Sequence, residues 1–451
     1  MKNNQGKAAA AAIIVALIIS TGLVVGLAAL ATEPAAAAAA PAKKTLTRGE
    51  DPVVILPAAL KPMEGRKIAE FAAFRYNDGK FDPIPFQVDE RGGDGLYIYT
   101  SGPQGKGGGD GLYKGKDELV FMAWDTGDQA PNKNFPCKAD ASAEVAVSDG
   151  SGTGWVYVVD CQDKPPRSSV DYVRQDSDAT HDWVRTERYA FAEAKGQSYF
   201  DRLCLRGPSG KVGPNLVDRL KGRGNLVAAG GLLKIHPLES DAKGSLLAYI
   251  DGPVRVIHHM KAFIQFSVVK LNIGGESENL FYSNYFVTPI SFGAPVSPSS
   301  LLSSITMRYS IDWLKAMDGS RYYDPVNKAG VTLDGKMSPE EKALNMTASH
   351  DWWGLTGPQG NFMMRMVLPV EWRKVVPITA YYVDDATALD PPESEPGQRC
   401  PGLKIDLMKM TAGTYKFRNY YMVPPGPIPG SAAIMNAIID RPLKVTAKEM
   451  D

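Results

Sequence analysis

Two stretches of the sequence concentrate carboxylates among glycines beside apolar runs. The first, FDPIPFQVDERGGDG, covers residues 81–95, and the second, GGGDGLYKGKDELVFMAWDTG, covers residues 107–127. Protein sites for calcium use several oxygen ligands, often carboxylates in turns. The candidate calcium ligands in these stretches are Asp94, Asp110, Asp117 and Glu118.

The spacing of these carboxylates differs from that of an EF-hand loop, which needs oxygen ligands at alternate positions and a final glutamate. Lys114 and Lys116 also occupy positions where ligands would be required. Glycine and aspartate shape turns, and aspartate accepts hydrogen bonds from nearby backbone N–H groups. We therefore predict that these carboxylates are mainly turn residues, with calcium as the weaker alternative and no other cofactor.

A second cluster, SHDWWGLTGPQG, covers residues 349–360. Indole rings can stack on the apolar faces of sugars while polar neighbours take the hydroxyl groups, a lining typical of ligand sites. We predict a substrate-binding site here. Its residues are His350, Asp351, Trp352 and Trp353. In the alternative interpretation one tryptophan packs in the core, because adjacent residues on a strand point to opposite faces.

Lyase or epimerase chemistry needs a base that removes a proton beside a carbonyl and a cation that neutralises a carboxylate. His350 and His259 are candidates for the base, and Arg308 and Arg365 are candidates for the cation. No sequence spacing joins these four residues, so catalysis stays an open question. His258 and His259 would point in opposite directions on a strand, and we expect one of them in the core.

The N-terminus carries an export signal. Lys2 and Lys7 precede residues 8–31, an apolar run without a charge. This pattern fits either a cleaved signal peptide or a retained membrane anchor. We assign residues 1–32 to this segment and residues 33–49, rich in alanine and proline, to a tether. In both cases the remaining chain is exported to the periplasm or cell surface.

Export gives meaning to the four cysteines, because disulfides form in oxidising compartments. None belongs to a C-x-x-C motif, so zinc ribbons and thioredoxin-like chemistry have no signature here. Two disulfides with three possible connectivities follow from the even count. We favour Cys137–Cys161, which flank an expected hairpin, together with Cys204–Cys400.

Short apolar or alternating runs, separated by the 44 glycines and 33 prolines, dominate the exported chain. Their length and their β-branched and aromatic content predict strands. The expected strands cover residues 52–60, 118–124, 143–149, 154–160, 245–250, 254–260, 263–273, 279–287, 362–368, 378–385 and 415–423. Ser338 and the Pro-Glu-Glu that follows it predict a short capped helix. Residues 299–317 combine helical and strand features.

The strand pattern predicts an all-β fold with a large antiparallel sheet-on-sheet body, a smaller β-domain and an N-terminal apolar helix. We place the boundary near residues 162–170, so that residues 50–161 form the smaller domain and residues 170–451 the larger one. The basic run at residues 219–223 is interpreted as a solvated turn. Residues 381–402 are interpreted as a strand and an acidic, proline-rich loop that Cys400 holds in place.

Three motifs resemble known proteins. IPFQVDE at residues 84–90 and DELVFMAWDTG at residues 117–127 resemble exported, largely uncharacterised bacterial proteins. IDGPVRV at residues 250–256 is similar to the galactose-mutarotase-like supersandwich of the rhamnogalacturonan-lyase-like group. The resemblance covers most of residues 52–425 and implies a β-rich body and a glycan ligand. No catalytic residue of that group matches a position here, so the resemblance assigns none.

Lysine plus arginine equals aspartate plus glutamate, at 50 each, which gives no general attraction to nucleic acid. We predict an exported protein, tethered to the membrane if the N-terminal helix is uncleaved, that binds or processes carbohydrate. The alternative is a non-catalytic structural subunit of a cell-envelope assembly. The expected partner is accordingly a glycan or an envelope protein.

Overall fold

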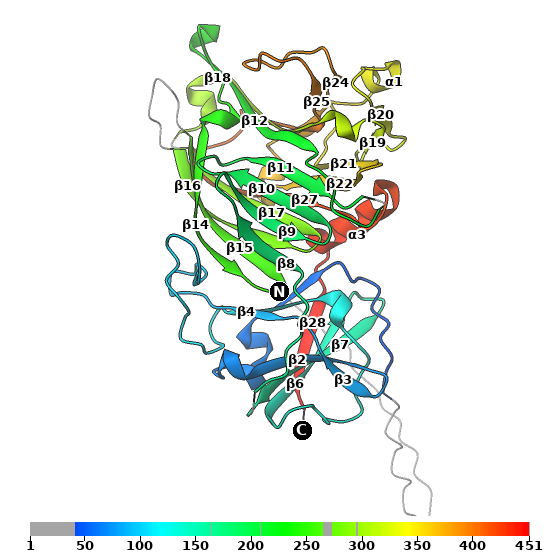
Figure 1. Cartoon of the computed structure of the whole chain (residues 1–451). Helices are drawn as coiled ribbons and strands as arrows, with labels where there is room; N and C mark the ends of the chain where they lie inside the picture. Colours follow the sequence, from blue (N-terminus) through cyan, green and yellow to red (C-terminus); the bar gives the residue numbers. More distant parts are fainter. Residues whose placement is uncertain (1–40, 163, 208, 265–272, 295, 451) are drawn as a thin grey trace, which may run out of the picture. The chain divides into compact units, whose positions relative to one another are not determined.

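The computed structural model describes residues 41–450 apart from residues 163, 208, 265–272 and 295 (Figure 1). Antiparallel strands in several sheets make up most of this part, which confirms the predicted all-β fold. Residues 41–451 form one compact unit. The predicted signal or anchor at residues 1–32 lies outside the described residues.

A smaller β region combines residues 52–161 with the C-terminal strand. Its three-stranded sheet has the order β1 (Pro52–Ile55), β5 (Glu118–Met122), β4 (Gln87–Asp89). Its five-stranded sheet has the order β28 (Lys444–Glu449), β6 (Ala139–Ser148), β7 (Thr153–Cys161), β2 (Phe71–Asn77), β3 (Lys80–Pro83). The red strand β28 therefore returns to the smaller region, although the sequence places it in the larger domain (Figure 1). The boundary at residues 162–170 stays a prediction.

The end of the expected tether lies against this smaller region. The backbone N–H groups of Thr45 and Leu46 both donate to the carbonyl of Thr153, and the Leu46 side chain is buried. The backbone N–H of Lys44 donates to Asp128. Ordered contacts with the body thus begin before residue 50, where the sequence predicts the folded body to start.

The larger body contains three sheets and a two-stranded ribbon. The four-stranded sheet has the order β11 (Phe200–Leu205), β10 (Tyr189–Ala194), β9 (His181–Thr186), β8 (Val173–Ser177). A five-stranded sheet has the order β13 (Leu233–Ile235), β12 (Val217–Ala228), β18 (Leu302–Trp313), β26 (Gly402–Asp406), β23 (Ile378–Tyr381). The nine-stranded sheet has the order β14 (Ala242–Asp251), β15 (Arg255–Ile264), β16 (Ile273–Tyr282), β17 (Tyr285–Ala294), β27 (Gly413–Met422), β22 (Gly360–Val367), β21 (Trp352–Gly357), β19 (Ser320–Tyr323), β20 (Val331–Leu333). The ribbon pairs β24 (Asp384–Asp385) with β25 (Gln398–Arg399).

The predicted sheet-on-sheet arrangement follows from how the apolar faces are covered. One core cluster joins Phe191 of the four-stranded sheet, Phe286 and Tyr421 of the nine-stranded sheet and Ile311 of the five-stranded sheet. Full burial of such a side chain contributes roughly 1.5–3 kcal/mol. Another cluster brings Val120 and Met122 of β5 against the larger body, so apolar contacts join the two regions.

Helices are few among the described residues. The α-helices are α1 (Pro339–Lys342), α2 (Val370–Arg373) and α3 (Ile428–Asp440). The 3-10 helices are η1 (Pro57–Ala59), η2 (Lys61–Met63), η3 (Ile68–Glu70), η4 (Ala123–Asp125), η5 (Ala229–Gly231), η6 (Glu239–Asp241), η7 (Pro298–Ser300) and η8 (Lys315–Met317). The predicted cap of α1 is confirmed, because the Ser338 and Glu341 side chains each accept a backbone N–H of the other residue. Within the described part of the chain, no helix has the length and apolar character needed to cross a membrane.

Several predicted elements differ from the structure. Residues 52–60 are a strand only as far as Ile55, because Pro57 begins a 3-10 turn. Residues 279–287 are two strands, since the chain turns at Ser283 and Asn284 between β16 and β17. Residues 265–272 of the strand expected at 263–273 lie outside the described residues.

Candidate functional site

Two of the sequence motifs meet in a buried polar network. Gln87 and Asp89 lie on one face of β4, and the Gln87 amide donates to Asp89 at 2.9 Å. The Gln87 carbonyl oxygen accepts the backbone N–H groups of Val254 and Arg255 at 3.0 and 2.8 Å. The Arg255 guanidinium lies 2.6 Å from Asp89, and its side chain is only 1% exposed. The PFQVDE and GPVRV motifs thus supply the two halves of one network.

Glu118 supplies the second carboxylate for this guanidinium. Arg255 Nη2 donates to Glu118 Oε2 at 2.6 Å, and Nη1 donates to the Tyr282 hydroxyl at 3.0 Å. Burial raises the pKa of Asp89 despite the opposing charge of Arg255. Burial would also raise the pKa of Glu118, but Arg255 and Arg91 together lower it below its ordinary value. The two arginines therefore stabilise the ionised form of Glu118. Keeping Asp89 ionised costs more free energy, because its burial outweighs the attraction of Arg255.

The network continues from Glu118 towards the surface. Arg91 Nη2 donates to Glu118 Oε1 at 2.8 Å, and its guanidinium lies 3.6 Å from the centre of the Tyr97 ring. The Tyr97 hydroxyl donates to Glu118 Oε2 at 2.8 Å. Glu278 of β16 accepts the Tyr97 backbone N–H and lies 3.4 Å from Arg91. Arg91 is thereby fixed by residues from both regions of the protein.

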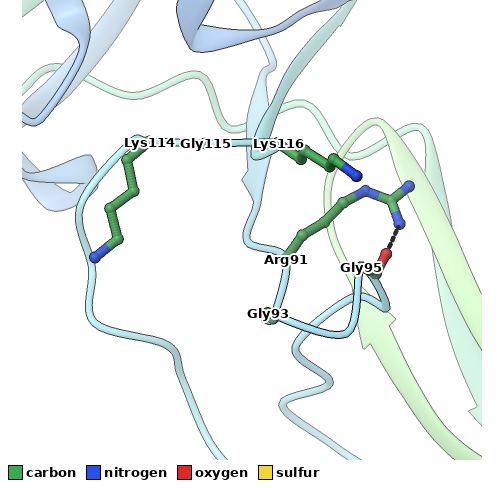
Figure 2. A pocket seen from close by; sticks show the side chains of 7 residues that line it. Arg91, Gly93, Gly95, Lys114, Gly115 and Lys116 are labelled. Atoms are coloured by element: carbon green, nitrogen blue, oxygen red, sulfur yellow. Dashed lines mark hydrogen bonds between the residues drawn. The ribbon is translucent and has the colours of Figure 1, made fainter.

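A hollow of about 420 Å³ opens beside Arg91 (Figure 2). Its lining residues are Arg91, Gly92, Gly93, Gly95, Lys114, Gly115 and Lys116. Figure 2 shows Arg91 and Lys116 extending in the same direction, with Lys114 pointing another way. A second hollow of about 280 Å³ shares Arg91, Gly92, Gly93 and Lys114. Its other lining residues are Glu90, Ile98, Asp110 and Asp117.

Asp117 ties together the two loops that form the walls. One of its carboxylate oxygens accepts the Arg91 backbone N–H at 2.8 Å, and the other accepts that of Lys114 at 2.8 Å. Asp94 accepts the backbone N–H of Leu96, two residues further on. Gly95 has a φ of +83°, a conformation that favours glycine at this turn. These are the turn-shaping roles that the sequence predicts for Asp94 and Asp117.

The positive charges that line the larger hollow are unequally neutralised. Arg91 faces Glu118, and Lys114 pairs with Asp110. Lys116 is exposed and forms no ion pair with any residue of the described chain. The larger hollow therefore presents one unmatched cation beside a fixed guanidinium, with glycine backbone around it. Such a surface suits an anionic group.

Asp110 and Asp117 line the same second hollow, but the calcium candidates are engaged by cations and backbone N–H groups of the protein. Glu118 neutralises two arginines, and Asp110 pairs with Lys114. Among residues 41–450 without the undescribed gaps, no group of three or more His, Cys, Asp or Glu side chains could hold a metal ion. A calcium role for Asp94, Asp110, Asp117 and Glu118 stays the weaker prediction.

The residues of the predicted sugar site point in different directions. His350 is buried, and its Nε2 lies 3.0 Å from Asp324 Oδ1 while its Nδ1 donates to the Ala348 carbonyl at 2.6 Å. Trp353 is completely buried in the core, whereas Trp352 is half-buried. The Trp353 ring therefore offers no face to a ligand. A substrate site at residues 350–353 stays a prediction.

Of the predicted residues, the structure brings Asp351 and Arg365 together. Arg365 Nη2 lies 3.1 Å from Asp351, and Nη1 lies 2.8 Å from Asp440 of α3. This arrangement fixes α3 against β22. Both carboxylates engage the guanidinium, so Arg365 is already neutralised by the protein itself.

The other catalytic candidates lie in separate surroundings. Arg308 of β18 pairs with Asp390 at 2.8 Å. His259 of β15 pairs with Glu276 at 2.9 Å and stacks on Tyr99, with ring centres 4.8 Å apart. His258 is the expected core histidine, and burial lowers its pKa to about 3. No contact between described residues joins Arg308 to either His259 or His350.

Sequence reasoning missed the side chains that line the hollow. In the sequence, Lys114 and Lys116 stand out only as residues that do not suit a calcium site, and no motif singles out Arg91. The sequence carries a Lys-Gly-Lys loop at residues 114–116 and a glycine-rich loop at residues 92–95, but a pair of loops becomes one site only in three dimensions. Glu193 of β10 was also missed. It is a buried carboxyl group whose pKa burial raises to about 8.

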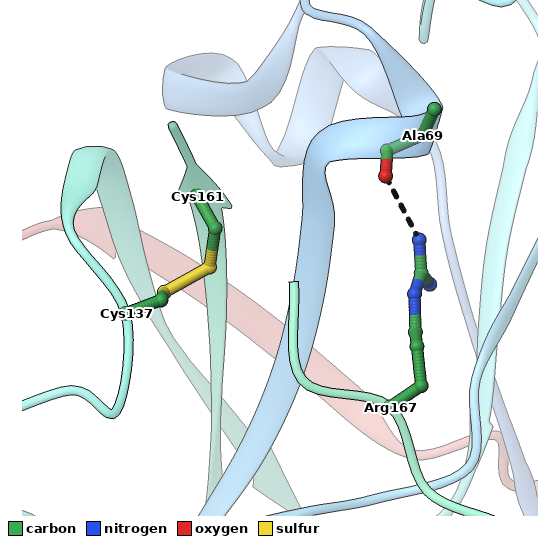
Figure 3. Close-up of a disulfide and its surroundings, with 4 residues drawn as sticks. All are labelled: Ala69, Cys137, Cys161 and Arg167. Carbon is green, nitrogen blue, oxygen red and sulfur yellow. Dashed lines mark hydrogen bonds between the residues drawn. A yellow bond between two sulfur atoms is a disulfide. The ribbon is translucent and has the colours of Figure 1, made fainter. Parts of the chain in front are cut away.

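The predicted Cys137–Cys161 disulfide is confirmed (Figure 3). The predicted Cys204–Cys400 disulfide is wrong, because both cysteines are free and buried. Cys204 lies in β11, while Cys400 follows β25 at the edge of another sheet. Disulfides form in oxidising compartments, so the Cys137–Cys161 bridge fits a periplasmic or extracellular protein.

No protein-family model matches the chain, and a search of curated proteins finds no match. Among solved structures, the chain is similar to an alpha-mannosidase from Enterococcus faecalis V583, with 8% sequence identity and a TM-score of 0.45. The similarity covers 91% of this chain and 46% of that protein. This chain therefore spans less than half the length of the enzyme.

Proposed function

We propose that this protein is exported and binds an acidic carbohydrate in the hollow beside Arg91. The observation that carries the proposal is the exposed Lys116, which has no ion pair among the described residues and lies beside a guanidinium that Glu118 and Tyr97 hold in place. The guanidinium nitrogens of Arg91 already donate to Glu118, Gly95 and Glu278. Arg91 therefore contributes positive charge, while Lys116 can make a charge-assisted hydrogen bond to a carboxylate, and such bonds are stronger than neutral ones. The sequence resemblance supports a glycan, and the lining supports an anionic one.

The lining of the larger hollow suits binding rather than catalysis. The larger hollow is lined by arginine, lysine and glycine, side chains that supply charge but no group ready to take a proton near neutral pH. Asp117, at the second hollow, already accepts a backbone hydrogen bond with each oxygen. Fixed positive charge and backbone N–H groups are suited to orienting a bound anion.

Calorimetric titration with oligogalacturonate and with a neutral oligosaccharide of the same length would test this function. We expect the acidic ligand to bind more tightly. Lys116→Ala should weaken that binding about tenfold, the effect of losing one charge-assisted contact. Lys374→Ala is the matched control, because Lys374 is exposed and far from this loop in the sequence. Equal affinity for both sugars, or an unchanged affinity after Lys116→Ala, would refute the proposal.

Export and tethering are part of the same proposal. The apolar run at residues 8–31 supports either a signal or an anchor. Sequencing the N-terminus of the protein from cells would distinguish them. A start near Thr32 means a cleaved signal, and an intact Met1 in the membrane fraction means a retained anchor.

A second candidate function, a subunit of a cell-envelope assembly, has one specific observation in its favour. Leu232 and Leu233 at the β12–β13 turn are 92% and 51% exposed, and Leu301 is 66% exposed. Exposed apolar side chains of this size can mark a protein interface. Cross-linking in cells should then capture an envelope protein, and Leu232→Ser with Leu233→Ser should abolish the capture.

A further inference from the structure

The basic run at residues 219–223 is not the solvated turn that the sequence predicts. It lies within β12, and the Lys221 side chain is 0% exposed. Lys221 Nζ lies 2.6 Å from Asp312, 2.7 Å from Glu393 and 3.3 Å from Asp390. A buried ammonium group is stable only when carboxylates compensate for its lost hydration. Partners distant in the sequence therefore decide where this lysine lies.

Two arginines share the same carboxylates. Arg223 of β12 pairs with Glu239 at 3.1 Å and with Asp390 at 2.6 Å. Arg308 of β18 pairs with Asp390 at 2.8 Å, and it donates to the Tyr381 hydroxyl at 2.5 Å. Lys221, Arg223 and Arg308 thus form one cationic group on neighbouring strands. We call these three residues the cationic triad.

Asp390 and Glu393 belong to the acidic, proline-rich loop at residues 386–397. The sequence predicts that Cys400 holds this loop, but Cys400 is a free thiol. Most of the loop is exposed, including Pro391 and Pro392, while the Asp390 and Glu393 side chains are largely covered. The two carboxylates are therefore the loop's charged contacts with the triad.

The loop at residues 386–397 supplies part of the negative charge that neutralises the cationic triad. Without the loop, the body supplies Asp312 and Glu239 as carboxylates that contact the triad. Arg308 then loses Asp390, its carboxylate partner in the described structure. An unmatched, partly desolvated guanidinium is costly. An open loop is thus unfavourable unless another anion takes the place of its carboxylates.

We propose that the cationic triad is a second anion site and that Asp390 and Glu393 occupy it as a built-in ligand. The external ligand would carry two neighbouring oxyanions, as in a polycarboxylate or a sulfated sugar. It would exchange with the loop, so its apparent affinity would be reduced by the small fraction of molecules with an open loop. This site uses none of the residues that line the hollow beside Arg91, and the two proposals can fail separately.

Removing the loop charges should expose the site. In Asp390→Asn with Glu393→Gln, citrate should bind at least tenfold more tightly than in the wild-type protein, as measured by calorimetry at constant ionic strength. The control is Asp385→Asn with Glu395→Gln, which removes the same charge from the same part of the chain without touching the triad. This control should leave citrate affinity at the wild-type level. Titrations with inorganic sulfate and oligogalacturonate would distinguish sulfate from carboxylate ligands.

Adding Arg308→Gln to the loop variant should remove the gained affinity. A folded loop variant without tighter citrate binding would overturn the proposal, as would a gain that survives Arg308→Gln. If the loop variant does not fold, hydrogen exchange of the wild-type protein decides. Citrate should speed exchange of residues 386–397 more than sodium chloride at equal ionic strength, and equal exchange in the two salts would refute the site.

Discussion

The carboxylate of Asp89 lies 2.6 Å from the guanidinium of Arg255, 166 residues further along the chain. Both side chains are 1% exposed, so water cannot replace either partner. β4 belongs to the smaller β region and β15 to the nine-stranded sheet. This ion pair therefore joins the two regions, and Glu118 connects it to Arg91 at the hollow.

Arg255→Met should be strongly destabilising. It leaves Asp89 buried beside Gln87 without a cation, and breaking a buried pair in this way costs about 3–5 kcal/mol. Urea unfolding would measure the loss. Arg185→Met is the control, because Arg185 pairs with Asp176 at the surface and such pairs contribute about 1 kcal/mol or less. Similar losses in the two variants would contradict a structural role for the buried pair.

The local sequence pattern predicted strands well where residues adjacent in the sequence determine the structure. Residues 143–149 and 154–160 alternate or run apolar, and both lie in the β6–β7 hairpin. The pattern missed the turn between β16 and β17, because this turn is formed by Ser283 and Asn284 and contains no glycine. It also missed α3, because the Ile-Pro-Gly-Ser start of this helix has the composition of a loop. Burial of Ile428, Ala432 and Met435 stabilises the helix, and that is a tertiary effect.

The candidate site was less predictable because its contacts cross long stretches of sequence. The PFQVDE and GPVRV motifs were both recognised, but nothing in either specifies that Asp89 meets Arg255. Lys221 was assigned to solvent from its charge alone. Asp312, Asp390 and Glu393 instead allow it to be buried. Charged residues can be placed only when their distant partners are known.

Glu193 predicts a loss of stability as pH rises. Burial raises its pKa from 4.5 to about 8, and Asp182 and Asp201 add to the shift. Between these values the unfolded chain releases the proton while the folded chain retains it, so stability falls with increasing pH. Glu193→Gln removes this titration. Urea unfolding should show the wild-type protein losing on the order of 3 kcal/mol relative to the variant between pH 5 and pH 9.

Glu187→Gln is a suitable control for Glu193→Gln. Glu187 lies close by in the sequence but is exposed, so its replacement should change stability similarly at both pH values. Parallel pH profiles for wild type and Glu193→Gln would contradict a buried neutral carboxyl group.

The His350–Asp324 pair predicts the pH dependence of another contact. Burial opposes the charge on His350, but Asp324 and the Ala348 carbonyl raise its pKa above the ordinary value. Burial would raise the pKa of Asp324, yet His350 and Asn327 lower it to about 2. The contribution of His350 to the free energy of unfolding is therefore complete below the pKa that this residue has in the unfolded chain. It is lost as the pH rises through the higher pKa that the residue has in the folded protein. The aspartate contribution is lost only as pH falls towards 2.

His350→Gln should accordingly cost most stability at mildly acidic pH. We expect a loss of about 1–3 kcal/mol at pH 5.5, the cost of leaving the buried partner Asp324 without its charged neighbour, and a smaller loss at pH 8.5. His236→Gln is the control, since His236 is exposed. Denaturant unfolding at the two pH values would measure both variants, and a loss for His350→Gln that grows with pH would show that this histidine is neutral.

The cysteines allow a test of both covalent structure and compartment. Peptide mapping without reductant should recover Cys137 joined to Cys161, with Cys204 and Cys400 as thiols. The two thiols should react with an alkylating reagent only after unfolding, because both are buried and burial raises the pKa of each.

Cys137→Ser with Cys161→Ser should lower the free energy of unfolding by about 3 kcal/mol, since the bridge closes a loop with a sequence separation of 24 residues. Cys204→Ser is the single-site control and leaves the bridge intact. A peptide linking Cys204 to Cys400 would contradict the structure, and four thiols in protein isolated from cells would contradict export as well.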